Sequence, residues 1–185
     1  MKFYKFFFLS AMISLVSCSP NSASVSDDYL KDLNNLLDGL HQDAHEGNFN
    51  TYFGRYSADA IFLGTDKTER WTIEEFKIYA KPAFEDGHGW SYEVIERNWE
   101  GDSDIRWFDE ILFNEKLGHC RGTGVVQLIN DEWKISHYAL TMLVPNSIAS
   151  EIGRQTQDAD KKILLQDGFK DCLLYTSPSP RDSDQ

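Results

Sequence analysis

Apolar side chains recur every three or four residues after position 27, which is the spacing of one face of a helix. The residues that follow this spacing are Leu30, Leu33, Leu36, Leu37, Leu40 and Ala44. Ser26 or Asp27 can cap the start of this helix, and Gly47 ends it. A second, shorter helix is predicted next, ending at residues 57–59, with an aromatic face of Phe49, Tyr52, Phe53 and Tyr56.

A short strand pair and a third helix follow. Residues 60–64 are apolar and predict a strand, and residues 69–71 can return beside it after a polar turn. Thr72 and Glu75 have the spacing of a capping box, in which each side chain bonds a free backbone N–H at a helix start. A helix is therefore predicted from Thr72 to about Phe84.

The pattern changes to a strand period after residues 87–89. Four strands are predicted, at about 90–99, 105–113, 119–129 and 133–144. The turns between them are short, so neighbouring strands must be antiparallel and form a meander. Helices followed by a sheet predict an α+β domain over residues 28–146, and a last helix is predicted in 147–171.

The N-terminus has the features of an export signal. Lys2 and Lys5 precede an apolar run that is too short to span a bilayer. Leu15-Val16-Ser17-Cys18 resembles the bacterial lipobox, which implies a signal peptide over 1–17, a lipid on Cys18 and a polar tether over 18–27. Ser19 favours the outer membrane, with the domain facing the periplasm. The alternative is an ordinary secretory signal with an incidental cysteine.

The C-terminus has a different origin. Residues 172–182 read as the translation of a transposase-type sequencing adapter, so we treat 172–185 as foreign to the natural protein. A Ser/Pro-rich natural tail is the alternative. Without Cys18 and Cys172 only Cys120 remains, which allows no intrachain disulfide. Because a lone buried cysteine usually behaves as a small hydrophobic side chain, we do not expect Cys120 to be a nucleophile.

Composition excludes several functions. With 41% hydrophobic and 14% aromatic residues the chain is globular, and its formal net charge of −12 disfavours nucleic-acid binding. The sequence has no Gly-rich phosphate loop, Ser-His-Asp elbow or Cys-x-x-Cys pair, so no cofactor is expected. His41 and His45 lie one helical turn apart, but without a His-Glu-x-x-His motif we predict no metal site.

Residues 28–146 resemble the SnoaL-like branch of the nuclear transport factor 2-like superfamily. The resemblance rests on the element order and on the segments 47–49, 56–60, 62–65 and 133–137, with further similarity at 107–110 and 121–124. It implies a cone-shaped fold, in which N-terminal helices cover a curved antiparallel sheet around a cavity. Such relatives include cyclases, isomerases, dehydratases and binding modules, so the resemblance constrains the fold more than the activity.

Strand register decides which side chains share a face. If the turns pair Phe113 with His119 and Ile129 with Trp133, Asp109 lies opposite Thr123. The odd-numbered face then carries Trp107, Asp109, Arg121, Thr123, His137 and Thr141. We expect this face to line the cavity. The even-numbered face is more apolar and would then be a dimer surface, although a one-residue slip or a bulge exchanges the two faces.

Candidate site residues follow from this placement. Asp109 or His137 could act as a general base, and Arg121 or Tyr138 could stabilise an oxyanion. The alternative, which we favour, is a structural ion pair between Asp109 and Arg121 with an interior His137. The predicted ligand-binding residues are Trp71, Trp107, Arg121, Tyr138 and Asp66.

Three functions remain open. The first is a lipid-anchored envelope protein that binds a small apolar molecule with a polar end. The second is a cofactor-free isomerase, cyclase or dehydratase that uses Asp109 or His137 in proton transfer. The third is a non-catalytic homodimeric interaction module of the cell envelope. In each case the only contact with the membrane is through the N-terminal lipid.

Overall fold

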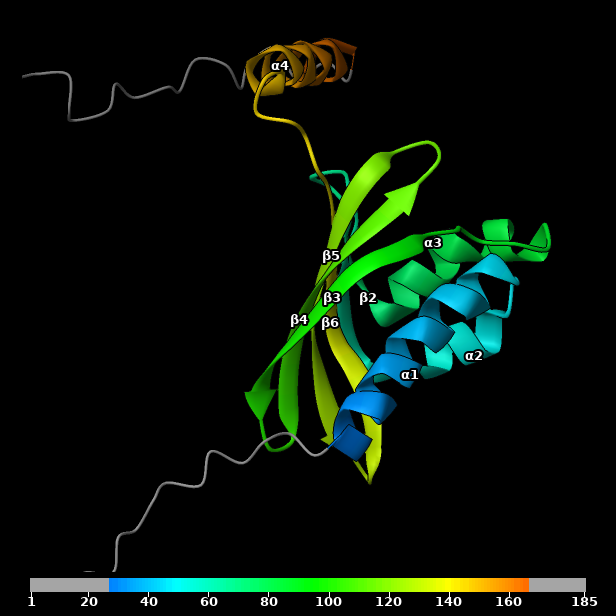
Figure 1. Ribbon diagram of the computed structural model, residues 1–185. Coiled ribbons are helices and arrows are strands. Elements are labelled where there is room, and N and C mark those ends of the chain that lie inside the picture. Colours follow the sequence, from blue (N-terminus) through cyan, green and yellow to red (C-terminus); the bar gives the residue numbers. More distant parts are fainter. Residues whose placement is uncertain (1–26, 167–185) are drawn as a thin grey trace, which may run out of the picture.

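The computed structural model describes residues 27–166, and Figure 1 shows their arrangement. The predicted signal peptide, Cys18, most of the tether and the adapter-like tail lie outside these residues. The elements are α1 (Asp27–His45), α2 (Phe49–Gly54), β1 (Tyr56–Leu63), β2 (Arg70–Thr72), α3 (Ile73–Glu85), β3 (Glu93–Asp102), β4 (Ile105–Asn114), β5 (Gly118–Ile129), β6 (Glu132–Met142) and α4 (Ala149–Gln166).

Six strands form one curved sheet in the order β2-β1-β6-β5-β4-β3. Strands β3 to β6 form the predicted antiparallel meander. Strand β1 pairs in parallel with β6, with Phe62 opposite Tyr138, so the sheet is mixed rather than wholly antiparallel. Helices α1, α2 and α3 cover one face, and the predicted α+β architecture is confirmed.

The boundaries differ from prediction at the first strand. Helix α2 ends at Gly54 and β1 begins at Tyr56, whereas the sequence pattern extended the helix to residues 57–59. Tyr56 is buried and pairs with Ile135, so its tertiary contacts favour a strand over the continued helix. The capping box of Thr72 and Glu75 is present as predicted. No helix within residues 27–166 is both long and apolar enough to cross a membrane.

Two differences from the predicted pairing, one in a turn and one at a bulge, cancel each other in the register of β6 against β5. Asn130 and Asp131 both have positive φ and form a tight turn that pairs Ile129 with Glu132, not with Trp133 as predicted. A bulge then adds one residue between Ile135 and His137. Beyond the bulge the predicted register holds, because His137 lies opposite Val125 as expected.

The helices pack on the even-numbered face of β4 and β5. The buried residues of these strands are Arg106, Phe108, Glu110, Leu112, Cys120, Gly122, Gly124 and Val126. They face the apolar stripe of α1, including Leu33, Leu37 and Leu40. The expectation that the odd-numbered face lines the cavity is therefore wrong. The even-numbered face is also unavailable as a dimer surface, because the helices cover it.

Candidate functional site

A cavity of about 180 Å³ lies between the helices and the sheet. Its walls are mainly aromatic, formed by Tyr52, Phe62, Trp71, Phe76, Tyr79, Trp90, Tyr92 and Tyr138. Several of these rings are close to parallel. The rings of Phe62 and Phe76 are 3.9 Å apart at 16°, and those of Phe62 and Tyr138 are 5.7 Å apart at 2°. The cavity therefore has flat, apolar walls.

One end of the cavity is bordered by the turn between β1 and β2. Gly64, Thr65 and Glu69 lie there, and Thr65 is exposed. A Cβ atom on Gly64 would overlap Oε2 of Glu69, so glycine makes room for this carboxylate. The backbone N–H of Asp66 donates to the same oxygen over 3.1 Å. An acidic side chain therefore stands at the exposed end of the cavity.

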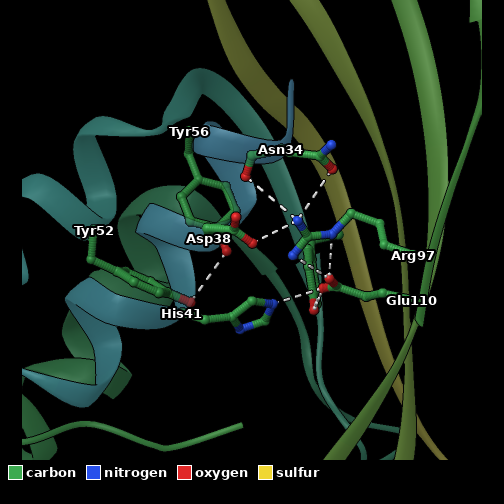
Figure 2. A network of polar contacts seen from close by, with 8 residues as sticks. Asn34, Asp38, His41, Tyr52, Tyr56, Arg97 and Glu110 are labelled. Carbon is green, nitrogen blue, oxygen red and sulfur yellow. Dashed lines mark hydrogen bonds and ion pairs between the residues drawn. The ribbon is translucent and has the colours of Figure 1, made fainter. Parts of the chain in front are cut away.

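The buried carboxylate of Glu110 stands behind the cavity wall, and Figure 2 shows its partners. His41 Nε2 and the Tyr138 hydroxyl each lie 2.9 Å from Oε1. On Oε2, Nε of Arg97 donates a hydrogen bond of 3.0 Å and Nη2 makes an ion-pair contact at 2.9 Å. This fully buried charge is thus bonded from helix α1, from the neighbouring strand β3 and from β6, which lies on the other side of β5.

A bulge in β3 places Arg97 beside Glu110. Val94 pairs with Leu112, but Glu96 pairs with Ile111, so the intervening Ile95 is the extra residue. Arg97 consequently lies directly opposite Glu110 on the covered face. Its Nη1 also reaches Oδ1 of Asp38 on α1 at 2.7 Å. The arginine therefore joins the sheet to the first helix.

Gly122 provides the space in which this network forms. It lies opposite Glu110 on the neighbouring strand β5. A Cβ atom at this position would lie 2.4 Å from the Tyr138 hydroxyl and 3.0 Å from Oε1 of Glu110. Any side chain larger than hydrogen would separate the tyrosine from the carboxylate.

The network changes the acidity of its members. Burial acts to raise the pKa of Glu110, but the hydrogen bond and charge of His41, the charge of Arg97 and the Tyr138 hydrogen bond outweigh it, and the pKa is lowered. Burial raises the pKa of Tyr138 well above its ordinary value, and the charge of Glu110 raises it further. At neutral pH, Glu110 is a carboxylate and Tyr138 a neutral hydroxyl.

This charge state also fixes which atom of His41 carries the proton between the two side chains. A carboxylate only accepts hydrogen bonds, so the proton that bridges His41 and Glu110 lies on Nε2. Nδ1 points away from Glu110 and has no hydrogen-bond partner among the described residues. His41 and Tyr138 both line the cavity. Together they form its polar end, an imidazole and a hydroxyl held by one buried carboxylate.

The sequence-predicted residues divide between the two faces. Trp71 and Tyr138 line the cavity, whereas Asp66 lies beside its exposed end and bonds Thr68. Trp107, Asp109 and His137 line a second, more open hollow of about 330 Å³ on the opposite, open face, together with Thr123. We expected these residues to line the helix-covered cavity. This expectation is wrong, because the even-numbered side chains of β4 point toward the helices and the odd-numbered ones point away.

Arg121 belongs to the open face as well. It is exposed and lies between Ile111 and Thr141 in the sheet. Within residues 27–166 it forms no ion pair with Asp109, whose carboxylate accepts from Asn98 over 3.2 Å instead. The alternative of a structural Asp109–Arg121 ion pair is therefore also wrong.

Sequence reasoning missed Glu110, His41 and Arg97 as site residues. One signal was available, because Glu110 is an acid in the middle of an otherwise apolar strand face. His41 was considered only with His45, but Nδ1 of His45 bonds the Ser91 hydroxyl at 2.7 Å. No group of three metal-binding side chains occurs in the part of the chain that the structure describes.

Comparison with known proteins places the chain in a family. Residues 33–145, more than half of the chain, match the family described as SnoaL-like domain. The chain belongs to this family. A search of curated proteins finds no match.

Solved structures agree with this SnoaL-like fold. An NTF2-like protein of unknown function from Pseudomonas putida KT2440 has a TM-score of 0.56 at 10% identity, covering 66% of this chain and 92% of its own. A candidate dehydratase of the NTF2-like family from Streptomyces avermitilis has a TM-score of 0.54 at 11% identity, covering 64% and 99%. At such identities the likeness shows the fold alone.

Replacing the buried carboxylate tests the network. Glu110→Gln should lower the free energy of unfolding at neutral pH by on the order of 3 kcal/mol, because Arg97 and His41 lose their charged partner. The lowered pKa of Glu110 stabilises the folded state above the ordinary glutamate pKa of about 4.3, and this stability is lost as the pH falls below it.

Urea unfolding measured from neutral to acidic pH checks both effects. The native protein should lose stability on acidification more steeply than Glu110→Gln, and the exposed control Glu93→Gln should follow the native protein. Equal pH dependence of the native protein and Glu110→Gln would contradict an ionised, bonded Glu110.

Proposed function

We propose that this SnoaL-like domain binds a small, flat, largely apolar molecule in the helix-covered cavity. The polar end of that molecule would lie against His41 and Tyr138. The observation that carries this proposal is the cavity itself, which combines aromatic walls with one organised polar end. Such a combination of apolar walls and a few convergent polar groups is typical of small-molecule sites.

The size of the cavity limits the ligand. About 180 Å³ is below the range of drug-sized sites, which begins near roughly 300 Å³. An apolar cavity of about 150 Å³ is enough to bind benzene. We therefore propose a ligand of one or two rings that packs against wall rings such as Phe62 and Trp71.

The two predicted ligand-binding tryptophans provide a matched test. Trp71 lines the cavity and stacks on Tyr79 at 4.3 Å, whereas Trp107 lies on the open face and is 52% exposed. Trp71→Ala should weaken the binding of naphthalene, measured by saturation-transfer NMR, by roughly fivefold to tenfold through lost stacking and contact area. Trp107→Ala should leave the affinity unchanged. A larger loss with Trp107→Ala would place the site on the open face.

Proton transfer is a second candidate function, favoured by the bond between His41 and Glu110. A carboxylate that holds one ring nitrogen orients an imidazole and stabilises the cation formed when the other nitrogen accepts a proton. Nδ1 of His41 is the accepting atom in this arrangement. One structural neighbour is named as a candidate dehydratase.

A flat probe with an acidic C–H bond tests this candidate. In 5-nitrobenzisoxazole a base removes the proton on C3 while the ring N–O bond breaks, giving a coloured cyanophenolate without a co-reactant. We expect His41→Gln to reduce the rate by about a hundredfold or more. His137→Gln, on the open face, should retain the rate of the native protein. No rate above the buffer background with the native protein would remove the enzymatic candidate.

We further propose that the domain is exported and anchored by a lipid on Cys18, as the lipobox resemblance implies. In a Gram-negative host grown with an alkynyl fatty acid, the native protein should carry the label and fractionate with the outer membrane. Cys18→Ser should remove the label, whereas Cys120→Ser should retain it because Cys120 is buried in the domain. A label that persists in Cys18→Ser would contradict lipidation at this position.

A further inference from the structure

The hydrogen-bond donors of His41 and Tyr138 at the polar end of the cavity are both bonded to Glu110. The single O–H of Tyr138 donates to Oε1 of Glu110, and Nε2–H of His41 donates to the same oxygen. A tyrosine hydroxyl has one proton and two lone pairs. What remains of Tyr138 for a ligand is therefore an oxygen that accepts.

A third polar group lies beside them. Tyr92 lines the cavity, and its ring centroid is 6.3 Å from that of His41. Its hydroxyl has no hydrogen-bond partner among the described residues, and burial raises the pKa of Tyr92 to about 12. This hydroxyl stays protonated at neutral pH and is able to donate to a ligand.

The charges around the cavity are unfavourable for an anion. Glu110 stands directly behind His41 and Tyr138, and Glu69 lines the exposed end. The neighbouring cation, Arg97, does not line the cavity, and its nitrogens are directed to Glu110, Asp38 and Asn34. A carboxylate ligand would therefore meet the like charge of Glu69 at the exposed end and the lone pairs of the Tyr138 oxygen at the other.

We infer that the cavity selects a neutral hydroxyl group on a flat apolar body, and so binds phenols or alcohols in preference to carboxylates. A ligand hydroxyl donates to the Tyr138 oxygen and accepts from Tyr92. A carbonyl group only accepts, and a carboxylate is repelled. This inference rests on the proposed binding function and names the chemical class of its ligand.

Three probes of one shape test the inference at neutral pH: naphthalene, 2-naphthol and 2-naphthoate. Ligand-observed NMR gives the affinity of naphthalene for the native protein. The affinities of 2-naphthol and 2-naphthoate then follow from how well each displaces naphthalene. We expect 2-naphthol to bind about tenfold more tightly than naphthalene, as one or two net hydrogen bonds supply. The naphthoate should bind more weakly than naphthalene.

Two tyrosine variants separate the polar end from the rest of the cavity. Tyr92→Phe should reduce the preference for 2-naphthol over naphthalene to about twofold while leaving naphthalene binding unchanged. The reason is that the substitution removes only the tyrosine hydroxyl, which donates a hydrogen bond to the ligand hydroxyl. The control Tyr29→Phe removes a hydroxyl from a side chain that is 49% exposed and does not line the cavity, and it should keep the full preference. The melting temperature of each variant confirms that it is folded.

The outcomes separate the two proposals. Equal binding of naphthalene and 2-naphthol would overturn the hydroxyl inference and leave the proposed apolar binding site intact. Tightest binding of the naphthoate would also overturn it, because the polar end would then be donating hydrogen bonds. Failure of all three probes to bind would overturn the proposed function together with the inference.

Discussion

The fold of this domain depends on the carboxylate of Glu110, which is fully buried. An isolated charge in an apolar interior costs many kcal/mol, so Glu110 can exist there only with partners that satisfy both oxygens. Those partners come from α1, β3 and β6, which joins the helical layer to the sheet at one point. The same bonds orient the two polar groups that face the cavity. One constraint therefore ties the fold to the site.

Two bulges make this constraint possible. Without the extra residue in β3, the register of Val94 with Leu112 would place Arg97 opposite Asp109 on the open face instead of opposite Glu110. Without the extra residue in β6, the register of Ile135 with Val126 would likewise turn Tyr138 to the open face. Both bulges lie next to the site, where they direct a polar side chain inward. The glycine at 122 then leaves room for their meeting.

The sequence was sufficient for the elements and for most of the register. The capping box at Thr72, the meander and the pairs Asp109 with Thr123 and Phe113 with His119 were all predictable, because they follow from local spacing. Which face of the sheet the helices cover was not predictable. A period of two is symmetric, and the polar residues of the odd-numbered face suggested chemistry there. The adjacent Asp109 and Glu110 have nearly the same chemistry, and only the packing of α1 on one face distinguishes them.

The central claim is that Glu110 holds a proton on Nε2 of His41. Nitrogen-15 NMR of the histidine rings measures this directly, with His41 assigned by its absence in His41→Gln. At neutral pH the His41 ring should show a proton bound to Nε2, and Glu110→Gln should lower the occupancy of that proton. A bare Nε2 in the native protein, or an Nε2 proton unchanged by Glu110→Gln, would contradict the claim.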